Sequence, residues 1–202
     1  MIAVIDYGVG NLFSVEKALI AAGGEAVVTN DVEIIKSADK LVLPGVGAFG
    51  DCMKELEKRN LVGVIKNEIE KNKSLLGICV GLQLLFEESE ESPGIKGLGV
   101  LNGRIKKINS KGEKLPHIGW NSLDITDVKG NIDLFKGLEK NSYVYFVHSY
   151  HAETNAKIIT ATSEYGEKIT AAVALKNVAA TQFHPEKSGD VGLKILKNFV
   201  KA

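Results

Sequence analysis

Cys79 is the residue whose surroundings best suit covalent chemistry. It follows an apolar run at residues 75–78 and stands in the pattern Gly-x-Cys-x-Gly, with Gly77 before it and Gly81 after it. A strand, a tight turn and a helix in this order form a nucleophile elbow, here with cysteine in place of serine. The glycines leave room for neighbouring elements, and the helix N-terminus favours a thiolate. The pattern predicts a nucleophile; without this setting, the residue would be a small buried apolar side chain.

A thiol nucleophile needs a base, and the base needs a group that orients it. Among the four histidines, His184 stands out because it ends an apolar run at residues 178–183 and is followed by Pro185 and Glu186. Pro185 stiffens the chain, and Glu186 is close enough to hydrogen-bond the imidazole and fix its tautomer. Taken alone, this motif also fits a surface loop with an incidental histidine. Together with the elbow, it indicates a Cys-His-Glu triad.

A glycine-rich segment at residues 44–50, Pro-Gly-Val-Gly-Ala-Phe-Gly, follows another apolar run. It lacks the Lys-Ser/Thr ending of a phosphate-binding P-loop. Beside an elbow, its backbone N–H groups can instead help to form an oxyanion hole with the N–H of Val80. A plain turn from strand to helix is the alternative. The second cysteine, Cys52, has no elbow around it, and we expect it to pack in the core.

The composition narrows the class of protein. The 202 residues suit one domain spanning 1–202, and 25 basic and 25 acidic residues leave a formal net charge of zero. That balance gives no broad attraction to nucleic acid or to a membrane. Two cysteines are too few for a disulfide scaffold, and no Cys/His cluster has the spacing of a metal site. The N-terminus reads as a strand rather than a signal peptide, and no apolar run reaches the ~18 residues that cross a bilayer. We therefore expect a cytoplasmic protein.

The first half of the chain alternates apolar runs with amphipathic segments, as in a parallel sheet covered by helices on both faces. The expected strands are residues 2–6, 25–29, 40–43 and 74–78, the third ending at Pro44-Gly45. The expected helices are 11–22, 31–37, 51–59, 61–72 and 80–87, with Asn11 and Asp31 as caps of the first two. The acidic run 87–91 is interpreted as the solvated end of the last helix. Loops after parallel strands gather at one sheet edge, where α/β proteins bind ligands.

The second half has a different pattern. Six strand-like segments are closely spaced, as in antiparallel hairpins: residues 100–109, 117–123, 143–148, 158–163, 169–175 and 178–183. Residues 188–201 form an amphipathic helix. The predicted fold class is therefore α/β, with a mostly parallel central sheet flanked by helices and an additional antiparallel region.

The motifs together resemble those of the class I, triad-type glutamine amidotransferases, a family with a flavodoxin-like fold. The elbow at 77–85 and the Phe-His-Pro-Glu motif at 183–186 carry this resemblance. One branch, the glutaminase subunits of imidazole glycerol phosphate synthase, is similar at four further segments: 44–50, 117–121, 145–150 and 186–188. The resemblance runs nearly from end to end. Val80 and Leu82 stand where this branch often has leucine and methionine, and both changes are apolar.

The resemblance implies a glutaminase with no cofactor and no metal. Cys79 attacks the side-chain amide of L-glutamine, His184 protonates the departing ammonia and then activates water, and Glu186 orients His184. The oxyanion would be held at Val80, Val46 and Gly47. Glutamine would be bound at Gly45, Gly47, Gln83, Ser149 and Tyr150. Interface or gating residues would be Asn11, Trp120, His148 and Lys187.

The resemblance also implies a partner, the (β/α)₈-barrel cyclase of a heterodimer. Ammonia would pass through the barrel to a phosphoribosyl-type imidazole precursor. The products would be imidazole glycerol phosphate and aminoimidazole carboxamide ribotide, in histidine biosynthesis. We expect low activity from the free chain, because the loop at residues 45–47 would be misaligned until the partner docks.

Three other functions stay open. The first is another glutaminase of the same class, serving pyridoxal phosphate, nucleotide or tryptophan synthesis; the Gly-Val-Gly loop and the Pro-Glu-Lys-Ser ending disfavour it. The second is a cysteine peptidase or thiol hydrolase on a related elbow fold, disfavoured by the Pro-Glu after His184 and by the small size. The third is a binding subunit with a vestigial triad, disfavoured because all three triad residues are present.

Overall fold

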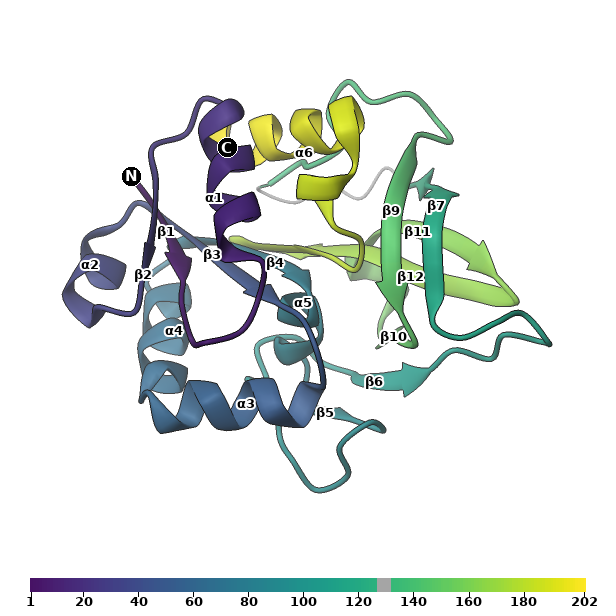
Figure 1. Ribbon diagram of the computed structural model, residues 1–202, viewed down its shortest axis with the longest axis horizontal. Coiled ribbons are helices and arrows are strands. Elements are labelled where there is room, and N and C mark those ends of the chain that lie inside the picture. Colours follow the sequence, from purple (N-terminus) through teal and green to yellow (C-terminus); the bar gives the residue numbers. More distant parts are fainter. Residues whose placement is uncertain (127–131) are drawn as a thin grey trace.

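A mixed sheet of eight strands is the centre of the computed structural model, which describes residues 1–126 and 132–202 (Figure 1). Its strands are β1 (Ile2–Ile5), β2 (Ala26–Thr29), β3 (Lys40–Gly45), β4 (Ser74–Cys79), β8 (Asp124–Ile125), β11 (Ile159–Tyr165), β12 (Glu167–Leu175) and β13 (Val178–Thr181). They lie in the order β2-β1-β3-β4-β13-β12-β11-β8. The first five run parallel, and the last three continue the sheet with antiparallel pairing. The predicted fold class is confirmed.

Helices cover both faces of the parallel part. They are α1 (Leu12–Ala21), α2 (Val32–Ser37), α3 (Phe49–Lys58), α4 (Leu61–Glu70), α5 (Val80–Leu84) and α6 (Gly189–Lys201). Figure 1 shows α1 and α6 together on one face and α3, α4 and α5 on the other. Strands β1, β4 and β13 are almost fully buried, which explains their continuous apolar runs. In the described part of the chain, no helix is long and apolar enough to cross a membrane.

The helix caps match the predictions in part. Asp31 accepts hydrogen bonds from the N–H groups of Glu33 and Ile34, so it caps α2 as expected. Asn11 occupies the N-cap position of α1, but its side chain makes no capping hydrogen bond. The position was therefore predicted correctly, whereas the contact was not.

The predicted end of the third strand at Pro44-Gly45 was wrong. Strand β3 continues through Gly45, which pairs with Cys79 of β4. A proline is tolerated there because the pairing of β3 with β1 stops at Val42, so no donor is needed on that side. The hydroxyl of Tyr7 donates to the Pro44 carbonyl over 2.7 Å. This extension brings the glycine-rich loop directly beside the elbow.

The helix predicted for 80–87 is shorter than expected. It ends at Leu84, because the carbonyls of Leu84, Leu85 and Phe86 accept hydrogen bonds from the backbone of residues 98–101. The acidic run 87–91 is consequently not a helix end. It contains the short strand β5 (Glu88–Ser89), which pairs with β6 (Arg104–Lys107).

Two small sheets complete the second half, and most of their strands lie at the right of Figure 1. One contains β5, β6 and β10 (Tyr150–Glu153), and the other contains β7 (His117–Ser122) and β9 (Tyr143–His148). The predicted strand 100–109 shrinks to β6, and the prediction lacked β5, β8 and β10. Segment 178–183 also pairs on both sides, antiparallel with β12 and parallel with β4. A 3₁₀ turn at Ala156–Ile158 precedes β11, and another at Pro185–Lys187 precedes α6.

Candidate active site

Cys79 lies at a strained turn between β4 and α5. Its φ of 56° and ψ of −112° are unusual for a residue with a side chain, and such strain is concentrated at functional sites. The turn depends on its glycines. A Cβ at Gly81 would lie 1.8 Å from the Leu43 carbonyl oxygen, and one at Gly77 would lie 2.9 Å from that of Gly81. The structure therefore forms the elbow that the sequence pattern predicts.

The next strand of the sheet brings His184 to the elbow. In the β13–β4 pairing, Thr181 lies opposite Ile78, so the residues after each strand emerge at the same edge. His184 N–H donates to the Tyr145 carbonyl over 3.0 Å, and the Ser188 hydroxyl donates to the His184 carbonyl over 2.6 Å. These contacts fix the backbone on both sides of the imidazole.

Glu186 is the partner that orients the imidazole. His184 Nδ1 lies 2.7 Å from Glu186 Oε1, and the two side chains are only 3% and 1% exposed. Since a carboxylate accepts, Nδ1 carries the proton and donates it. His184 Nε2 has no hydrogen-bond partner among the described residues, although it is buried. The second imidazole nitrogen is thus available for chemistry.

The electrostatics of His184 oppose the effect of its burial. Burial alone would lower its pKa, but contacts with the Cys79 thiol and the Glu186 carboxylate raise the pKa to about 9, above the ordinary 6.5. The imidazole is therefore protonated near neutral pH. A protonated imidazole beside a sulfur nucleophile can donate a proton to a leaving group.

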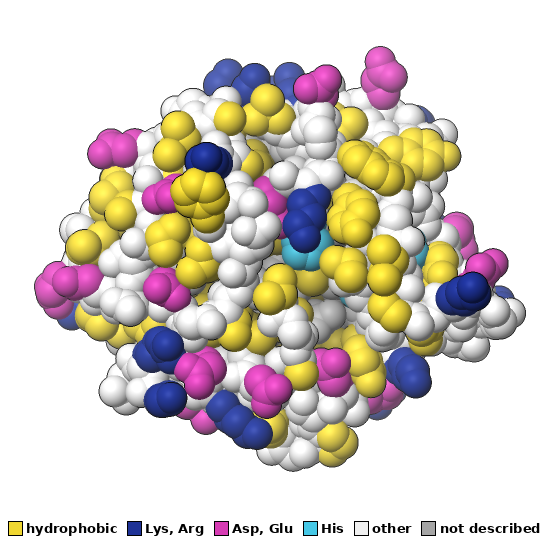
Figure 2. All heavy atoms as spheres, in the orientation of Figure 1, with side chains coloured by type: hydrophobic (Ala, Val, Ile, Leu, Met, Phe, Trp, Pro, Cys, Tyr) yellow, Lys and Arg dark blue, Asp and Glu magenta, His cyan; other side chains and the backbone are white. Residues whose placement is uncertain are grey.

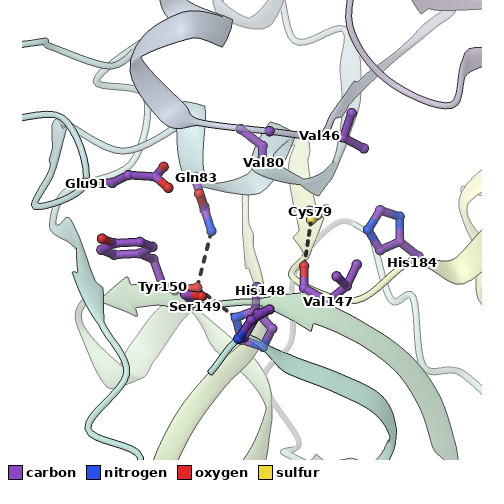
Figure 3. Close-up of a pocket in the computed structure, with 12 residues that line it drawn as sticks. Val46, Cys79, Val80, Gln83, Glu91, Val147, His148, Ser149, Tyr150 and His184 are labelled. Carbon is purple, nitrogen blue, oxygen red and sulfur yellow. Dashed lines mark hydrogen bonds between the residues drawn. The ribbon is translucent and has the colours of Figure 1, made fainter. Parts of the chain in front are cut away.

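A pocket of about 240 Å³ opens over Cys79 (Figure 3). Its lining residues are Val46, Gly47, Cys79, Val80, Gln83, Glu91, Pro116, Val147, His148, Ser149, Tyr150 and His184. In Figure 3, His184 lies at one end and Glu91 at the other, with Cys79 and Gln83 between them. Pockets for drug-sized ligands span roughly 300–1,000 Å³, so this one suits a smaller molecule.

Buried amides connect the pocket floor to the sulfur. Gln83 Nε2 donates to the Tyr150 carbonyl over 3.2 Å and to Gln182 Oε1 over 3.1 Å. Gln182 Nε2 lies 3.8 Å from Cys79 Sγ, within donor distance of a sulfur acceptor. Both amide side chains are at most 3% exposed. The sulfur, Gln83 and the Tyr150 backbone therefore form one connected unit.

The glycine-rich loop forms the opposite wall. Val46 and Gly47 line the pocket, and Cys52 Sγ lies 3.4 Å from the Val46 carbonyl oxygen. Gly45 does not line it, because it is the last paired residue of β3 and lies against Tyr7 and Gly81. Val80 is the first residue of α5, so its N–H has no partner within the helix. The predicted oxyanion residues thus border the pocket, whereas Gly45 lies outside it, at the start of the loop.

Sequence comparison decides the family. The sequence model of the class-I glutamine amidotransferases matches residues 3–202. The chain belongs to this family. It is 53% identical over 199 residues to the imidazole glycerol phosphate synthase subunit HisH of Aquifex aeolicus, covering 97% of this chain and 94% of the relative. It is 49% identical to the HisH subunit of Methanothermobacter thermautotrophicus over 201 residues, covering 100% and 98%. Within the family, the amidotransferase therefore groups with these subunits.

Solved structures agree on the fold. A crystal structure of a glutamine amidotransferase has a TM-score of 0.76 at 18% identity, covering 99% of each chain. The structure of PurLQS from Thermotoga maritima has a TM-score of 0.73 at 22% identity, covering 99% of this chain and 97% of that one. At these identities, the likeness supports the fold of the amidotransferase and nothing finer.

Three of the four residues predicted for an interface or gate lie at the surface of the amidotransferase. Asn11 and Lys187 are exposed, and Trp120 is 55% exposed with its ring edge-on to Tyr145. Figure 2 shows one face of the molecule, with apolar side chains gathered around a histidine near its centre. His148 differs, because it is 6% exposed and lines the pocket from β9. Its place in the pocket fits a gate better than a surface contact, and its role stays a prediction.

Sequence reasoning missed two polar residues of the amidotransferase site. Glu91 lines the pocket and accepts the Phe49 N–H over 2.8 Å. It lay hidden in the acidic run. Gln182 touches Cys79, and a buried amide within the apolar run 178–183 was a signal that could have found it.

Cys52 is 1% exposed, so the expected core packing is confirmed, and burial raises its pKa to about 11. No metal-binding cluster occurs among the residues the structure describes.

Proposed function

We propose that this chain hydrolyses the side-chain amide of L-glutamine to glutamate and ammonia, and that Cys79, His184 and Glu186 carry the reaction. The observation that supports this most directly is the buried His184–Glu186 pair beside a cysteine at a strained elbow. A thiol that faces an oriented imidazole is the arrangement that covalent acyl chemistry needs. Membership of the class-I glutamine amidotransferase family supports glutamine as the substrate.

In the first step, Cys79 Sγ bonds to the amide carbon, and the carbonyl electrons move onto oxygen. The N–H groups of Val80 and of the Val46–Gly47 loop stabilise that oxyanion, and one such donor is worth roughly 10²–10³ in rate. The C–N bond then breaks as the His184 imidazolium gives its Nε2 proton to nitrogen. Ammonia leaves, and a glutamyl thioester remains on Cys79.

In the second step, neutral His184 accepts a proton from water through Nε2, while the water oxygen attacks the thioester carbon. The C–S bond breaks, and glutamate is released from the thiolate. Glu186 accepts the hydrogen bond from Nδ1–H throughout and stabilises the charged imidazole. These steps use only a thiol, an imidazole and a carboxylate, so the proposal includes no cofactor.

The shape of the pocket gives glutamine one orientation. With the side-chain amide at Cys79 and His184, the amino-acid end reaches toward Glu91 at the opposite end of the pocket (Figure 3). The Glu91 carboxylate would pair with the α-ammonium group. Gln83 and the Ser149–Tyr150 backbone would position the same end. Gly47 would contact the substrate from the opposite wall.

We further propose that the ammonia passes to a (β/α)₈-barrel cyclase bound on the face of Figure 2, in a heterodimer of histidine biosynthesis. The names of the relatives support an imidazole glycerol phosphate synthase as the assembly. Its products would be imidazole glycerol phosphate and aminoimidazole carboxamide ribotide. Asn11, Trp120 and Lys187 lie exposed for this contact. Residues 1–202 would act as one amidotransferase domain in the cytoplasm, and residues 45–47 would align only when the partner docks.

Glutamate release from glutamine tests the proposal, measured for the chain alone and with the cyclase and its nucleotide substrate. We expect strong stimulation by the partner and complete loss in Cys79→Ala. A synthase from another amidotransferase pathway serves as the control partner and should not stimulate. Stimulation by that synthase instead would reject the assigned pathway. A full rate without any partner would reject the misaligned loop, and turnover by Cys79→Ala would reject the mechanism.

A further inference from the structure

A pair of histidines lies at the wall of the pocket, and the mechanism above does not use it. His117 of β7 and His148 of β9 stand directly opposite each other in the antiparallel pairing, and they are 3% and 6% exposed. His117 Nδ1 lies 3.1 Å from His148 Nε2, and His148 Nδ1 lies 2.7 Å from the Tyr150 carbonyl oxygen. At the other end, Asn121 Nδ2 lies 3.3 Å from His117 Nε2. The contacts form a continuous chain.

The chemistry at the two ends gives this chain of hydrogen bonds a direction. A carbonyl oxygen can only accept, so His148 Nδ1 must carry a proton, and in the neutral ring Nε2 must then accept. His117 Nδ1 therefore donates to His148, which leaves His117 Nε2 as the acceptor for the Asn121 amide. Asn121 fits this role, because its nitrogen also donates to the Glu164 carbonyl and its oxygen accepts the Ser122 N–H. Both histidines are thus fixed as Nδ1–H tautomers.

The surroundings keep both rings neutral. Burial lowers the pKa of His117 to about 4 and that of His148 to about 3. The His117 ring is stacked between Phe146 and Tyr165, with centroids 4.8 and 4.0 Å away. Neither ring has a carboxylate within hydrogen-bonding distance in the described chain. Two neutral, buried rings, one of them stacked, are suited to holding a geometry rather than to moving protons.

The chain of hydrogen bonds ends at the Tyr150 carbonyl oxygen, which belongs to the proposed glutamine site. The Tyr150 carbonyl accepts from His148 and also from Gln83, which contacts Gln182, and Gln182 contacts Cys79 Sγ. A shift of this carbonyl would therefore move the Ser149–Tyr150 backbone and Gln83 together. These are the groups to which the proposed function assigns the amino-acid end of glutamine.

We propose that the His117–His148 pair, in fixed Nδ1–H tautomers, is a positioning device that holds the Ser149–Tyr150 backbone and Gln83 in place for glutamine. This inference rests on the proposed function for its substrate, but the tautomers themselves do not. The pair acts on binding of the substrate and takes no part in bond breaking.

Nitrogen-15 NMR of the imidazole rings in the full-length chain tests the tautomers independently of activity. We expect His117 and His148 as Nδ1–H forms at neutral pH. His151 is an internal contrast, because its Nδ1 accepts the Thr170 N–H over 3.1 Å and its Nε2 lies 3.3 Å from Glu167 Oε1. His151 should therefore be the Nε2–H form. An Nε2–H form of either His117 or His148 would overturn the proposal.

Two variants of His148 then separate positioning from simple packing. In His148→Asn, the amide nitrogen replaces Nδ1 and can still donate to the Tyr150 carbonyl, whereas His148→Leu fills the space without a donor. We expect Leu to raise the KM for glutamine roughly tenfold with a much smaller change in kcat, and Asn to restore most of it. Equal KM values for wild type and His148→Leu, or no rescue by Asn, would contradict the positioning role.

The two readouts distinguish the possible failures. If wild-type protein with its partner does not turn over glutamine, the proposed function fails while the tautomers can still be read. If glutamine is turned over but the tautomers differ, the positioning device fails alone. If His148→Leu does not fold, the NMR assignment of the wild-type rings still decides the matter.

Discussion

His184 and His148 line the same pocket and are both almost fully buried, yet their surroundings favour opposite charge states. His184 is hydrogen-bonded to a carboxylate and lies beside the Cys79 sulfur, and these partners raise its pKa to about 9. The ring nitrogens of His148 face a carbonyl and a neutral imidazole, and burial lowers its pKa to about 3. Burial lowers the pKa of both rings, so the difference comes from the partners. In this pocket, hydrogen-bond partners decide which histidine is protonated near neutral pH and which stays neutral.

The largest expected difference between the two histidines is in catalysis. His184→Ala removes the proposed acid and base, and we expect kcat with the partner to fall roughly a thousandfold or more. His148→Asn should stay close to wild type in kcat. Steady-state glutamate release measures both, and circular dichroism checks that each variant is folded. A kcat of His184→Ala within tenfold of the wild-type kcat would contradict the proposed role of His184 as acid and base.

Replacing the carboxylate tests the cause of the high pKa. In Glu186→Gln, we expect the pKa of His184 to fall and kcat to fall roughly a hundredfold. In wild type, the folded chain holds a proton between pH 6.5 and about 9 that the unfolded chain has lost. The stability from this proton is therefore complete below pH 6.5 and is lost as the pH rises through about 9.

Chemical denaturation at about pH 6 and about pH 10 measures this linkage. Wild type should lose more free energy of unfolding across the interval than Glu186→Gln does, because the pKa of His184 is raised less in the variant. Imidazole titration by NMR gives the pKa itself. Identical pH slopes for the two proteins would show that the carboxylate does not sustain the charge on His184.

A smaller effect is expected outside the pocket. Trp120 is 55% exposed on the face of the proposed partner, so Trp120→Ala should weaken cyclase binding by about 2 kcal/mol, roughly 30-fold in Kd, with little change in stability. Leu175→Ala is the matched control, since Leu175 is 39% exposed at the opposite edge of the sheet, where β12 begins its turn into β13. Calorimetry with the purified cyclase measures both, and equal losses in the two variants would argue against a specific interface.

Motifs with neighbouring members could be predicted from the sequence. The elbow glycines lie two residues on either side of Cys79, and Glu186 lies two residues after His184, so each motif can be recognised locally. The structure places these residues together. The parallel strands were also found, because burial on both faces gives continuous apolar runs. Their roles in catalysis stay predictions until the variants are measured.

The rest depends on contacts between distant segments. The pairing of His117 with His148 follows from the register of β7 against β9, which no local pattern reveals. Glu91 resembled a solvated charge until residues 98–101 were seen to end α5 early and bring the acidic run to the pocket. Strands β5 and β8 have two residues each, too few for any periodicity to show.

The pairing of β4 with β13 has a consequence for how such a chain can change during evolution. Since Thr181 lies opposite Ile78, one sheet register sets the spacing between the nucleophile and its base. An insertion in the turn at Lys176–Asn177 that slipped this register by one residue would displace the base by about 3.3 Å and turn alternate side chains to the wrong face. Insertions in the loop at residues 109–116 leave the register alone. The outer surface can therefore adapt to new protein partners while the reacting groups keep their separation.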